Sequence, residues 1–178
     1  TVSINNGNLI GDNTDIDGFE QSIKNINYDV SDKTILVLGS GGVVPSIIFS
    51  LKRMNASKIV LSNRTKEKAE NLKKLFKEIE VIDWGKIVYF DMVVNATSLG
   101  LKENDKFNID FSNVGINKLF YDVIYNPVKT EFSDGGNLKG NKLVNGLDMF
   151  LFQAQKAFNI WHNIEPVIDG NLIKFLSE

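Results

Sequence analysis

The stretch GDNTDIDGF, residues 11–19, holds three aspartates within six positions. Carboxylates spaced so closely suit three roles: ligating calcium, accepting hydrogen bonds from the first turn of a helix, or acting in catalysis. The EF-hand template is matched through its sixth position if the loop starts at Asn13, but its twelfth position is then Lys24, which cannot ligate a cation. Calcium is therefore disfavoured. A helix cap at Thr14 or Asp15 and a catalytic carboxylate both stay open.

A second candidate site lies in LVLGSGGVVPS, residues 36–46. A strand of the buried type leads directly into Gly39-x-Gly41-Gly42 and then into a helix, the setting in which a dinucleotide pyrophosphate meets a helix N-terminus. The first glycine permits a tight turn, and the second lets the backbone approach the phosphates. The third fingerprint position is Val44 instead of glycine or alanine, so the match is imperfect. We expect a dinucleotide site here, and a plain strand–helix turn is the alternative.

The end of the next strand bears on which dinucleotide is bound. Rossmann units that bind NAD usually place Asp or Glu there, to bind the ribose 2′-hydroxyl. This chain has SNRT at residues 62–65, with Lys68 one turn further on. The guanidinium of Arg64 would bind a 2′-phosphate, which a carboxylate would repel. The pattern favours NADP over NAD. The alternative is that Thr65 only caps the helix while the cations are solvated.

Apolar strands and amphipathic helices alternate along the chain. Asn6-Gly7, between two short apolar stretches, predicts a hairpin at the beginning. The alternation that follows predicts a Rossmann-like, doubly wound α/β fold, with a mainly parallel sheet of about six strands and flanking helices. A helix is expected after GDNTD, and the polar segments 102–108 and 133–141 are expected to be surface connections. The other expected strands are 35–38, 59–61, 80–82, 92–95, 119–123 and 143–144, and the other expected helices are 42–54, 65–78 (with Ala69, Leu72, Leu75 and Phe76 facing inward), 148–161 and 172–176.

Composition narrows the class of protein. The 178 residues are 43% apolar, enough for a real core, and the net charge of −2 gives no electrostatic reason to expect nucleic acid. No apolar run is long enough to span a bilayer, so no membrane partner is expected. There is no cysteine and only one histidine, so we expect no metal site, and a cytoplasmic protein is the simplest interpretation.

Six segments together resemble the C-terminal, cofactor-binding part of the shikimate dehydrogenase family. Each is modest alone, but all six in this order are highly specific, and the resemblance covers the chain from its first turn to its last long helix. The segments are GDNTDIDGF (11–19), GSGG (39–42), SNRT (62–65), VNATSLG (94–100), YDVIYNPVKTEF (121–132) and NGLDMFLFQAQKAF (145–158).

The resemblance implies roles for particular residues. Asp15 matches the family's active-site aspartate, which binds hydroxyls of the substrate ring, and Tyr125 and Gln153 match further substrate contacts. From spacing alone, these two could instead be a core aromatic and a satisfied polar side chain. Val43 departs from the family, which typically has a small residue after the double glycine. The implied cofactor residues are Gly39, Ser40, Gly41, Gly42 and Val43 at the pyrophosphate, Asn63, Arg64, Thr65 and Lys68 at the 2′-phosphate and adenine, Asn95, Thr97 and Ser98 in the cofactor cleft, and Val123, Gly146 and Met149 beside the nicotinamide.

The implied activity is reversible hydride transfer between NADPH and the C3 carbonyl of 3-dehydroshikimate, giving shikimate in aromatic amino-acid biosynthesis. Two alternatives stay open: a quinate/shikimate dehydrogenase that prefers NAD, and a nucleotide-binding module without catalysis. The expected partner is the small-molecule substrate, and the expected state is a monomer or a homodimer.

The resemblance also implies how the chain divides. Residues 1–18 are expected to be the end of a substrate domain and a hinge, and residues 19–147 the NADP-binding domain. The C-terminal helices occupy 148–178, the first of them packing back toward the substrate cleft. The family's catalytic lysine sits in an upstream substrate domain, and no lysine of this chain matches its motif. We therefore expect a fragment of a longer enzyme, which alone binds NADP(H) without appreciable turnover.

Overall fold

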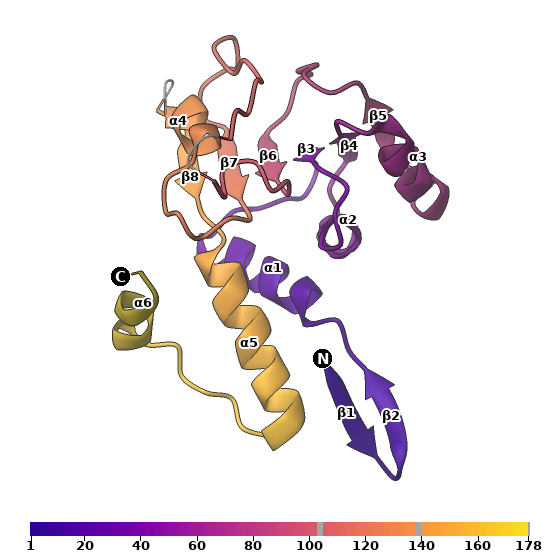
Figure 1. The fold of residues 1–178 in the computed structure, drawn as a ribbon, viewed down its shortest axis with the longest axis vertical. Helices are drawn as coiled ribbons and strands as arrows, with labels where there is room; N and C mark the ends of the chain where they lie inside the picture. The colour runs from indigo at the N-terminus through magenta and orange to yellow at the C-terminus, as the bar shows by residue number, and fades with distance from the viewer. Residues whose placement is uncertain (103–104, 138–139, 178) are drawn as a thin grey trace. The chain divides into compact units, whose positions relative to one another are not determined.

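A computed structural model describes residues 1–102, 105–137 and 140–177 (Figure 1). It divides into two compact units, one formed by Thr1–Asp29 with Asp148–Glu178, the other by Val30–Leu147. The strands are β1 (Val2–Asn5), β2 (Asn8–Gly11), β3 (Thr34–Leu38), β4 (Lys58–Ser62), β5 (Glu80–Ile82), β6 (Met92–Asn95), β7 (Leu119–Asp122) and β8 (Lys142–Val144). The helices are α1 (Thr14–Asn25), α2 (Val44–Arg53), α3 (Lys66–Leu75), α4 (Glu131–Asn137), α5 (Leu147–His162) and α6 (Gly170–Ser177).

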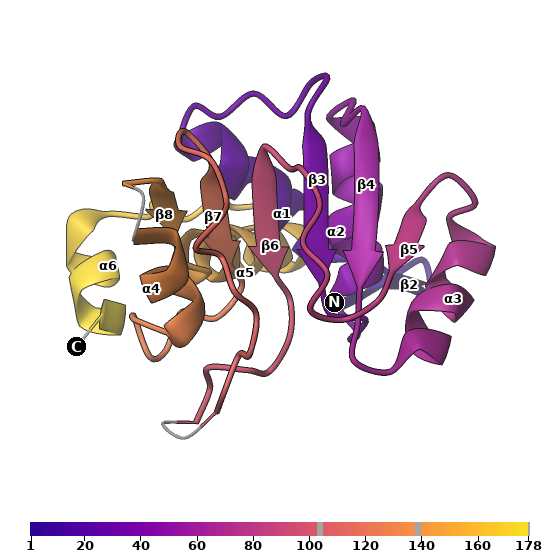
Figure 2. The same cartoon turned by 90° about the horizontal axis from the view of Figure 1, so that it is seen from above.

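The central unit contains a sheet of six parallel strands in the order β5-β4-β3-β6-β7-β8 (Figure 2). Helices α2 and α4 lie on opposite faces of this sheet in both views (Figures 1 and 2). The strand order reverses at β3: the chain runs outward to β4 and β5, then crosses back to β6 on the other side of β3. Open α/β sheets bind ligands outside the carboxyl ends of the strands at such a reversal. The Rossmann-like fold class expected from the sequence is confirmed.

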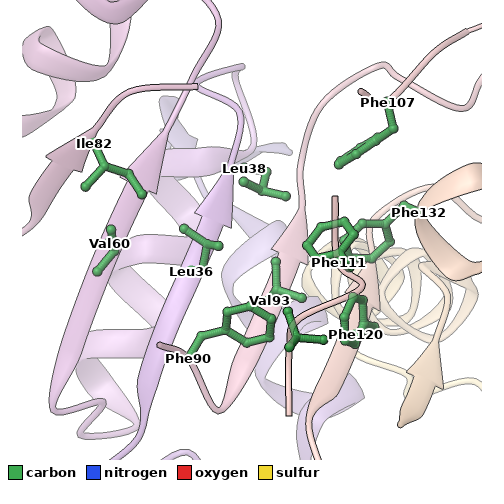
Figure 3. Packing of buried hydrophobic residues seen from close by; sticks show 11 residues of the cluster. Leu36, Leu38, Val60, Ile82, Phe90, Val93, Phe107, Phe111, Phe120 and Phe132 are labelled. Carbon is green, nitrogen blue, oxygen red and sulfur yellow. The ribbon is translucent and has the colours of Figure 1, made fainter. Parts of the chain in front are cut away.

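The core explains why the strands read as apolar runs. Side chains alternate along β3, so Leu36 and Leu38 point to one face of the sheet and their neighbours to the other, and all four residues 35–38 are buried. On the face of Leu36, phenylalanines from β7, α4 and the segment before β7 form one cluster (Figure 3). Within it, the rings of Phe111 and Phe120 have centroids 5.2 Å apart, and those of Phe120 and Phe132 are 5.4 Å apart. Both faces of the sheet are therefore covered.

Two sequence predictions in this unit are wrong. Segment 133–141 was expected to be a surface connection, but its residues up to Asn137 belong to α4, and residues 138–139 lie outside the described residues. Thr130 and Ser133 exchange backbone-to-hydroxyl hydrogen bonds of 3.0 and 3.3 Å, which cap the helix, and Phe132 anchors it in the core. Leu75 was expected to face inward, but it is 74% exposed because α3 ends there and the chain turns away from the helical period. The remaining expected helices and strands are present, and their ends differ from the expected bounds by at most three residues.

The other unit contains the β1–β2 hairpin and helices α1, α5 and α6. Asn6 and Gly7 adopt positive φ angles of 49° and 79°, as a two-residue hairpin turn requires, so the predicted hairpin is confirmed. Helices α1 and α5 approach closely at Gly18, where a Cβ would lie 2.7 Å from the carbonyl oxygen of Met149. Among the helices of the described ranges, none has the length and apolar character needed to cross a membrane.

Candidate functional site

The glycine turn after β3 has the backbone geometry that the sequence predicted. Gly39 has a φ of +113°, and a Cβ there would lie 2.5 Å from the carbonyl oxygen of Ala96, so no other residue fits without displacing backbone. Its N–H donates to the carbonyl of Ser62 over 2.8 Å, which fixes the turn against β4. Around Gly42 there is open space for a Cβ, and α2 begins without a side-chain cap. The N–H of Val44 donates to the carbonyl of Gly41 at 3.1 Å and Pro45 has no N–H, so an anion here would meet the N–H groups of the turn before α2 rather than those of its first turn.

A cavity of about 280 Å³ opens at this turn. It joins the glycine turn to the exits of β4, β5 and β6, all at the carboxyl edge of the sheet. Of the residues expected to bind the cofactor, this cavity brings together nine. It is lined by Gly39, Ser40, Gly41, Asn63, Arg64, Thr65, Lys68, Trp84, Ala96, Thr97, Ser98 and Leu99.

The exit of β4 supplies the positive charge of the cavity. Arg64 and Lys68 are both exposed, and within the described part of the chain neither forms an ion pair. The amide of Asn63 donates to the carbonyl of Thr65 over 2.8 Å, which orders the loop that carries the guanidinium. Thr65 occupies the N-cap position of α3 but makes no capping bond through its hydroxyl, so that hydroxyl is not used by the helix. Together, the two cations and the hydroxyl of Thr65 fit a phosphate better than a ribose hydroxyl.

The exit of β6 supplies an ordered polar loop. Asn95 is completely buried, and its Oδ1 accepts hydrogen bonds from the backbone N–H and the hydroxyl of Thr97, at 3.1 and 2.7 Å. The same hydroxyl accepts the N–H of Leu99 at 3.0 Å. Thr97 and Ser98 line the cavity, whereas Asn95 shapes the loop from below the surface. Of the three residues expected in the cofactor cleft, Thr97 and Ser98 therefore face the cavity, and Asn95 holds their loop in place.

A buried carboxylate in β7 was missed by the sequence analysis. Asp122 is 3% exposed and accepts hydrogen bonds from the amide of Asn95 (2.9 Å), the N–H of Ile124 (3.0 Å) and the hydroxyl of Thr130 (2.6 Å). It therefore joins the loop after β6 to the loop after β7. Burial raises the pKa of Asp122 from the ordinary 3.8, although the three hydrogen bonds oppose this. In the sequence, Asp122 is marked only as a charged residue at the end of an apolar strand.

The raised pKa of Asp122 predicts a pH dependence. Because the folded-state pKa exceeds the unfolded one, the group's contribution to the free energy of unfolding is complete below pH 3.8 and is lost as the pH rises through the raised value. The free energy of unfolding of the wild type minus that of Asp122→Asn should therefore fall over this interval, by about 1.4 kcal/mol for each pH unit by which the folded pKa exceeds the unfolded one. Urea denaturation of both proteins across the acid range measures this difference.

Asp110→Asn is the matched control. Hydrogen bonds from Ser112 lower the pKa of the exposed Asp110, so its stabilisation is present above the ordinary pKa and is lost as the pH falls. The difference between wild type and this variant should therefore change in the opposite direction. A difference for Asp122→Asn that rises with pH would show that the carboxyl is held in its charged form.

Two positions expected beside the nicotinamide are neighbours. These are Val123, directly after β7, and Gly146, which is buried after β8. The two segments pack so closely that a Cβ at Gly146 would overlap the carbonyl of Val123. The N–H of Gly146 donates to the carbonyl of Ile124 over 3.2 Å. Tyr125 follows at 37% exposure. Met149, the third expected position, belongs to the other compact unit, where it is 5% exposed.

The candidate substrate residues of α1 and α5 lie within that unit. The cap of α1 is Asn13, whose Oδ1 accepts the N–H of Asp15 at 3.1 Å, so the alternative that Thr14 or Asp15 caps the helix is wrong. The carboxylate of Asp15 is half-buried and is not needed for the cap. The side-chain oxygen of Gln153 on α5 accepts a hydrogen bond from the hydroxyl of Thr14 at 3.4 Å, and its side-chain nitrogen donates to the carbonyl of Phe150 at 3.0 Å. The residues of the calcium template thus form a capped helix, and within the described ranges no cluster of three acidic or histidine side chains could hold a metal ion.

The sheet, the glycine turn at its strand reversal and the basic exit of β4 define a Rossmann-like dinucleotide-binding protein. A family model described as shikimate / quinate 5-dehydrogenase matches residues 21–102. The chain belongs to the shikimate dehydrogenase family.

Individual relatives agree with this assignment. The chain is 50% identical over 176 residues to shikimate dehydrogenase (NADP(+)) of Pelagibacter ubique, an alignment that covers 99% of this chain and 66% of that protein. It is 39% identical to the enzyme of the same name from Caldicellulosiruptor saccharolyticus, across 100% of this chain and 67% of the relative. The crystal structure of Thermus thermophilus shikimate 5-dehydrogenase in complex with NADP(H) and shikimate superposes with a TM-score of 0.85 at 27% identity, covering 99% of this chain and 66% of that one. The chain thus spans about two thirds of the length of these relatives.

Proposed function

We propose that this chain is the cofactor-binding part of an NADP-dependent shikimate dehydrogenase, which interconverts 3-dehydroshikimate and shikimate in aromatic amino-acid biosynthesis. The observation that carries the proposal is the lining of the cavity at the glycine turn. It combines Arg64 and Lys68 with the turn and includes no carboxylate among the described residues, which is the charge pattern for a 2′-phosphorylated dinucleotide. Relatives named as NADP(+) enzymes support the same choice.

The residues present fit NADP. In the proposed arrangement, the turn from Gly39 to Val43 holds the pyrophosphate through its backbone N–H groups, and a Cβ at Gly42 would meet nothing within 4 Å, which leaves room for the phosphates there. Asn63, Arg64, Thr65 and Lys68 hold the 2′-phosphate. The loop of Thr97 and Ser98, fixed by Asn95, borders the cofactor, and Val123, Gly146 and Met149 border its nicotinamide. The bound cofactor supplies the hydride.

The remaining proposed roles concern the substrate. Asp15 binds a ring hydroxyl and takes part in the proton transfer that accompanies hydride transfer, for which a carboxylate that does not cap its own helix is suited. Gln153 and Tyr125 bind further substrate oxygens. The division into an end of the substrate domain (1–18), a cofactor domain (19–147) and C-terminal helices (148–178) stays a prediction, as do the cytoplasmic location and the monomeric or homodimeric state.

A steady-state assay tests this function in an enzyme that contains residues 1–178 together with a substrate domain. We expect shikimate oxidation with NADP⁺ to exceed that with NAD⁺ in kcat/KM by at least about tenfold, since one charge-assisted phosphate contact contributes this much. Quinate is the comparison substrate. Equal or faster oxidation with NAD⁺ would favour the quinate/shikimate alternative, and no oxidation with either cofactor would favour a non-catalytic module.

A further inference from the structure

Trp84 is the single aromatic side chain among the described residues that line the cavity. It follows β5 by two residues, and β5 pairs in parallel with β4 so that Ile82 lies opposite Ser62. The segments that follow β4 and β5 therefore leave the sheet at the same edge, and Trp84 lies beside the loop that carries Arg64.

Two contacts attach this exit of β5 to the β4–α3 loop. The hydroxyl of Ser62 donates to the carbonyl of Asp83 at 3.2 Å, and the ammonium of Lys66 pairs with the Asp83 carboxylate at 2.7 Å. The pair is exposed and contributes little to stability by itself. The ion pair instead fixes a position: it holds Asp83, the residue before Trp84, next to the start of α3.

The indole is supported from behind and open in front. Its ring lies 6.0 Å from that of Phe107 at an angle of 51°, and it packs on the core cluster of Figure 3, yet it is only half-buried and borders the cavity. A ring fixed on one side and exposed on the other is a rigid apolar surface. The rest of the lining is small, polar or charged, apart from Leu99.

The chemistry of the cofactor indicates what meets this surface. In NADP the 2′-phosphate and the adenine are attached to adjacent carbons of one ribose, so a base must lie within one sugar of whatever binds that phosphate. If Arg64 and Lys68 hold the phosphate, the adenine reaches the exits of β4 and β5. We propose that the indole of Trp84 forms the surface on which the adenine stacks, making Trp84 a further cofactor-binding residue; this rests on the function proposed above.

Stacking on an aromatic ring predicts a specific loss of affinity. Trp84→Leu keeps apolar volume but removes the ring, and it should weaken NADPH, NADH and 2′,5′-ADP by about 5- to 100-fold each, because all three carry adenine. Nicotinamide mononucleotide, which lacks adenine, should bind unchanged. Trp84→Phe should retain most of the affinity. Melting temperatures of both variants separate loss of stacking from loss of folding.

Fluorescence gives a second readout, because the chain has only two tryptophans. Trp161 belongs to the other compact unit, where its Nε1–H donates to the carbonyl of Val2 at 2.9 Å. In Trp161→Phe, the remaining emission comes from Trp84 and should be quenched when 2′,5′-ADP binds. In Trp84→Leu, the emission of Trp161 should not respond.

Three outcomes separate the proposals. If the wild type binds NADPH and Trp84→Leu binds it equally well, stacking is overturned while the proposed function stands. The same holds if 2′,5′-ADP binds to Trp161→Phe without changing its emission. If the folded wild type binds neither NADPH nor 2′,5′-ADP, the proposed function fails, and the role of Trp84 fails with it.

Discussion

Asp15→Asn is expected to lower kcat by at least about a hundredfold in an enzyme that contains this chain and a substrate domain. Asparagine keeps the size of the side chain and its capacity to accept a hydrogen bond, but it cannot exchange a proton. The cap of α1 is supplied by Asn13, so the substitution leaves the helix start intact. Affinity for NADPH should change by less than about twofold, since the glycine turn and Arg64 belong to the other compact unit.

Asp17→Asn is the matched control for this prediction. Both aspartates lie in the first turn of α1 and both are half-buried, so the two variants lose the same charge near the same helix end. Only Asp15 is assigned a role in proton transfer, and Asp17→Asn should retain near-normal turnover. Stopped-flow and steady-state rates with saturating NADPH measure both. Near-normal turnover of Asp15→Asn would remove Asp15 from the mechanism.

Arg64→Ala is expected to weaken NADPH binding by about 10- to 100-fold while leaving NADH affinity nearly unchanged. The guanidinium is exposed at the cavity and unpaired within the described residues, so its contribution appears only with a ligand that carries the 2′-phosphate. A hydrogen bond to a charged group contributes about 1.5–3 kcal/mol, which sets the expected range. Titration calorimetry with the two cofactors measures the change in preference.

Arg53→Ala controls for the loss of one positive charge. Arg53 closes α2 and lies over the ring of Phe49, with its guanidinium carbon 6.0 Å from the ring centroid, away from the cavity lining. Its removal should weaken both cofactors equally and only slightly, as a long-range effect screened by salt. Equal losses for NADPH and NADH in Arg64→Ala would show that Arg64 acts in the same general way and does not recognise the phosphate.

The sequence predicted the fold well where structure is set locally or by burial on both faces. The hairpin depends on the φ angles of Asn6 and Gly7 alone, and β3 is a continuous apolar run because both of its faces are covered. The prediction for segment 133–141 failed because its polar composition suggested a loop. In the structure a Cβ at Gly136 would lie 2.7 Å from the Phe120 ring, so the glycine serves close packing of α4 on the sheet.

The sequence predicted only those parts of the candidate site whose positions follow from the sheet. The glycine turn and Arg64 follow strands at a fixed place in the sequence, so their position at the carboxyl edge follows from the parallel sheet. Asp122 and Trp84 could not be found this way, since their roles depend on partners distant in sequence. The hydroxyl of Thr130 and the amide of Asn95 define the first, and the ring of Phe107 supports the second. Spacing alone does not reveal such contacts.

We propose that the cavity at the glycine turn recognises a 2′-phosphorylated dinucleotide. This recognition can be measured by equilibrium titration of residues 1–178 with NADPH and with NADH, in the same buffer at moderate salt. We expect NADPH to bind at least about tenfold more tightly than NADH, and a higher salt concentration to reduce this difference in affinity, because Arg64 and Lys68 are exposed. NADH binding as tightly as NADPH, or more tightly, would contradict it.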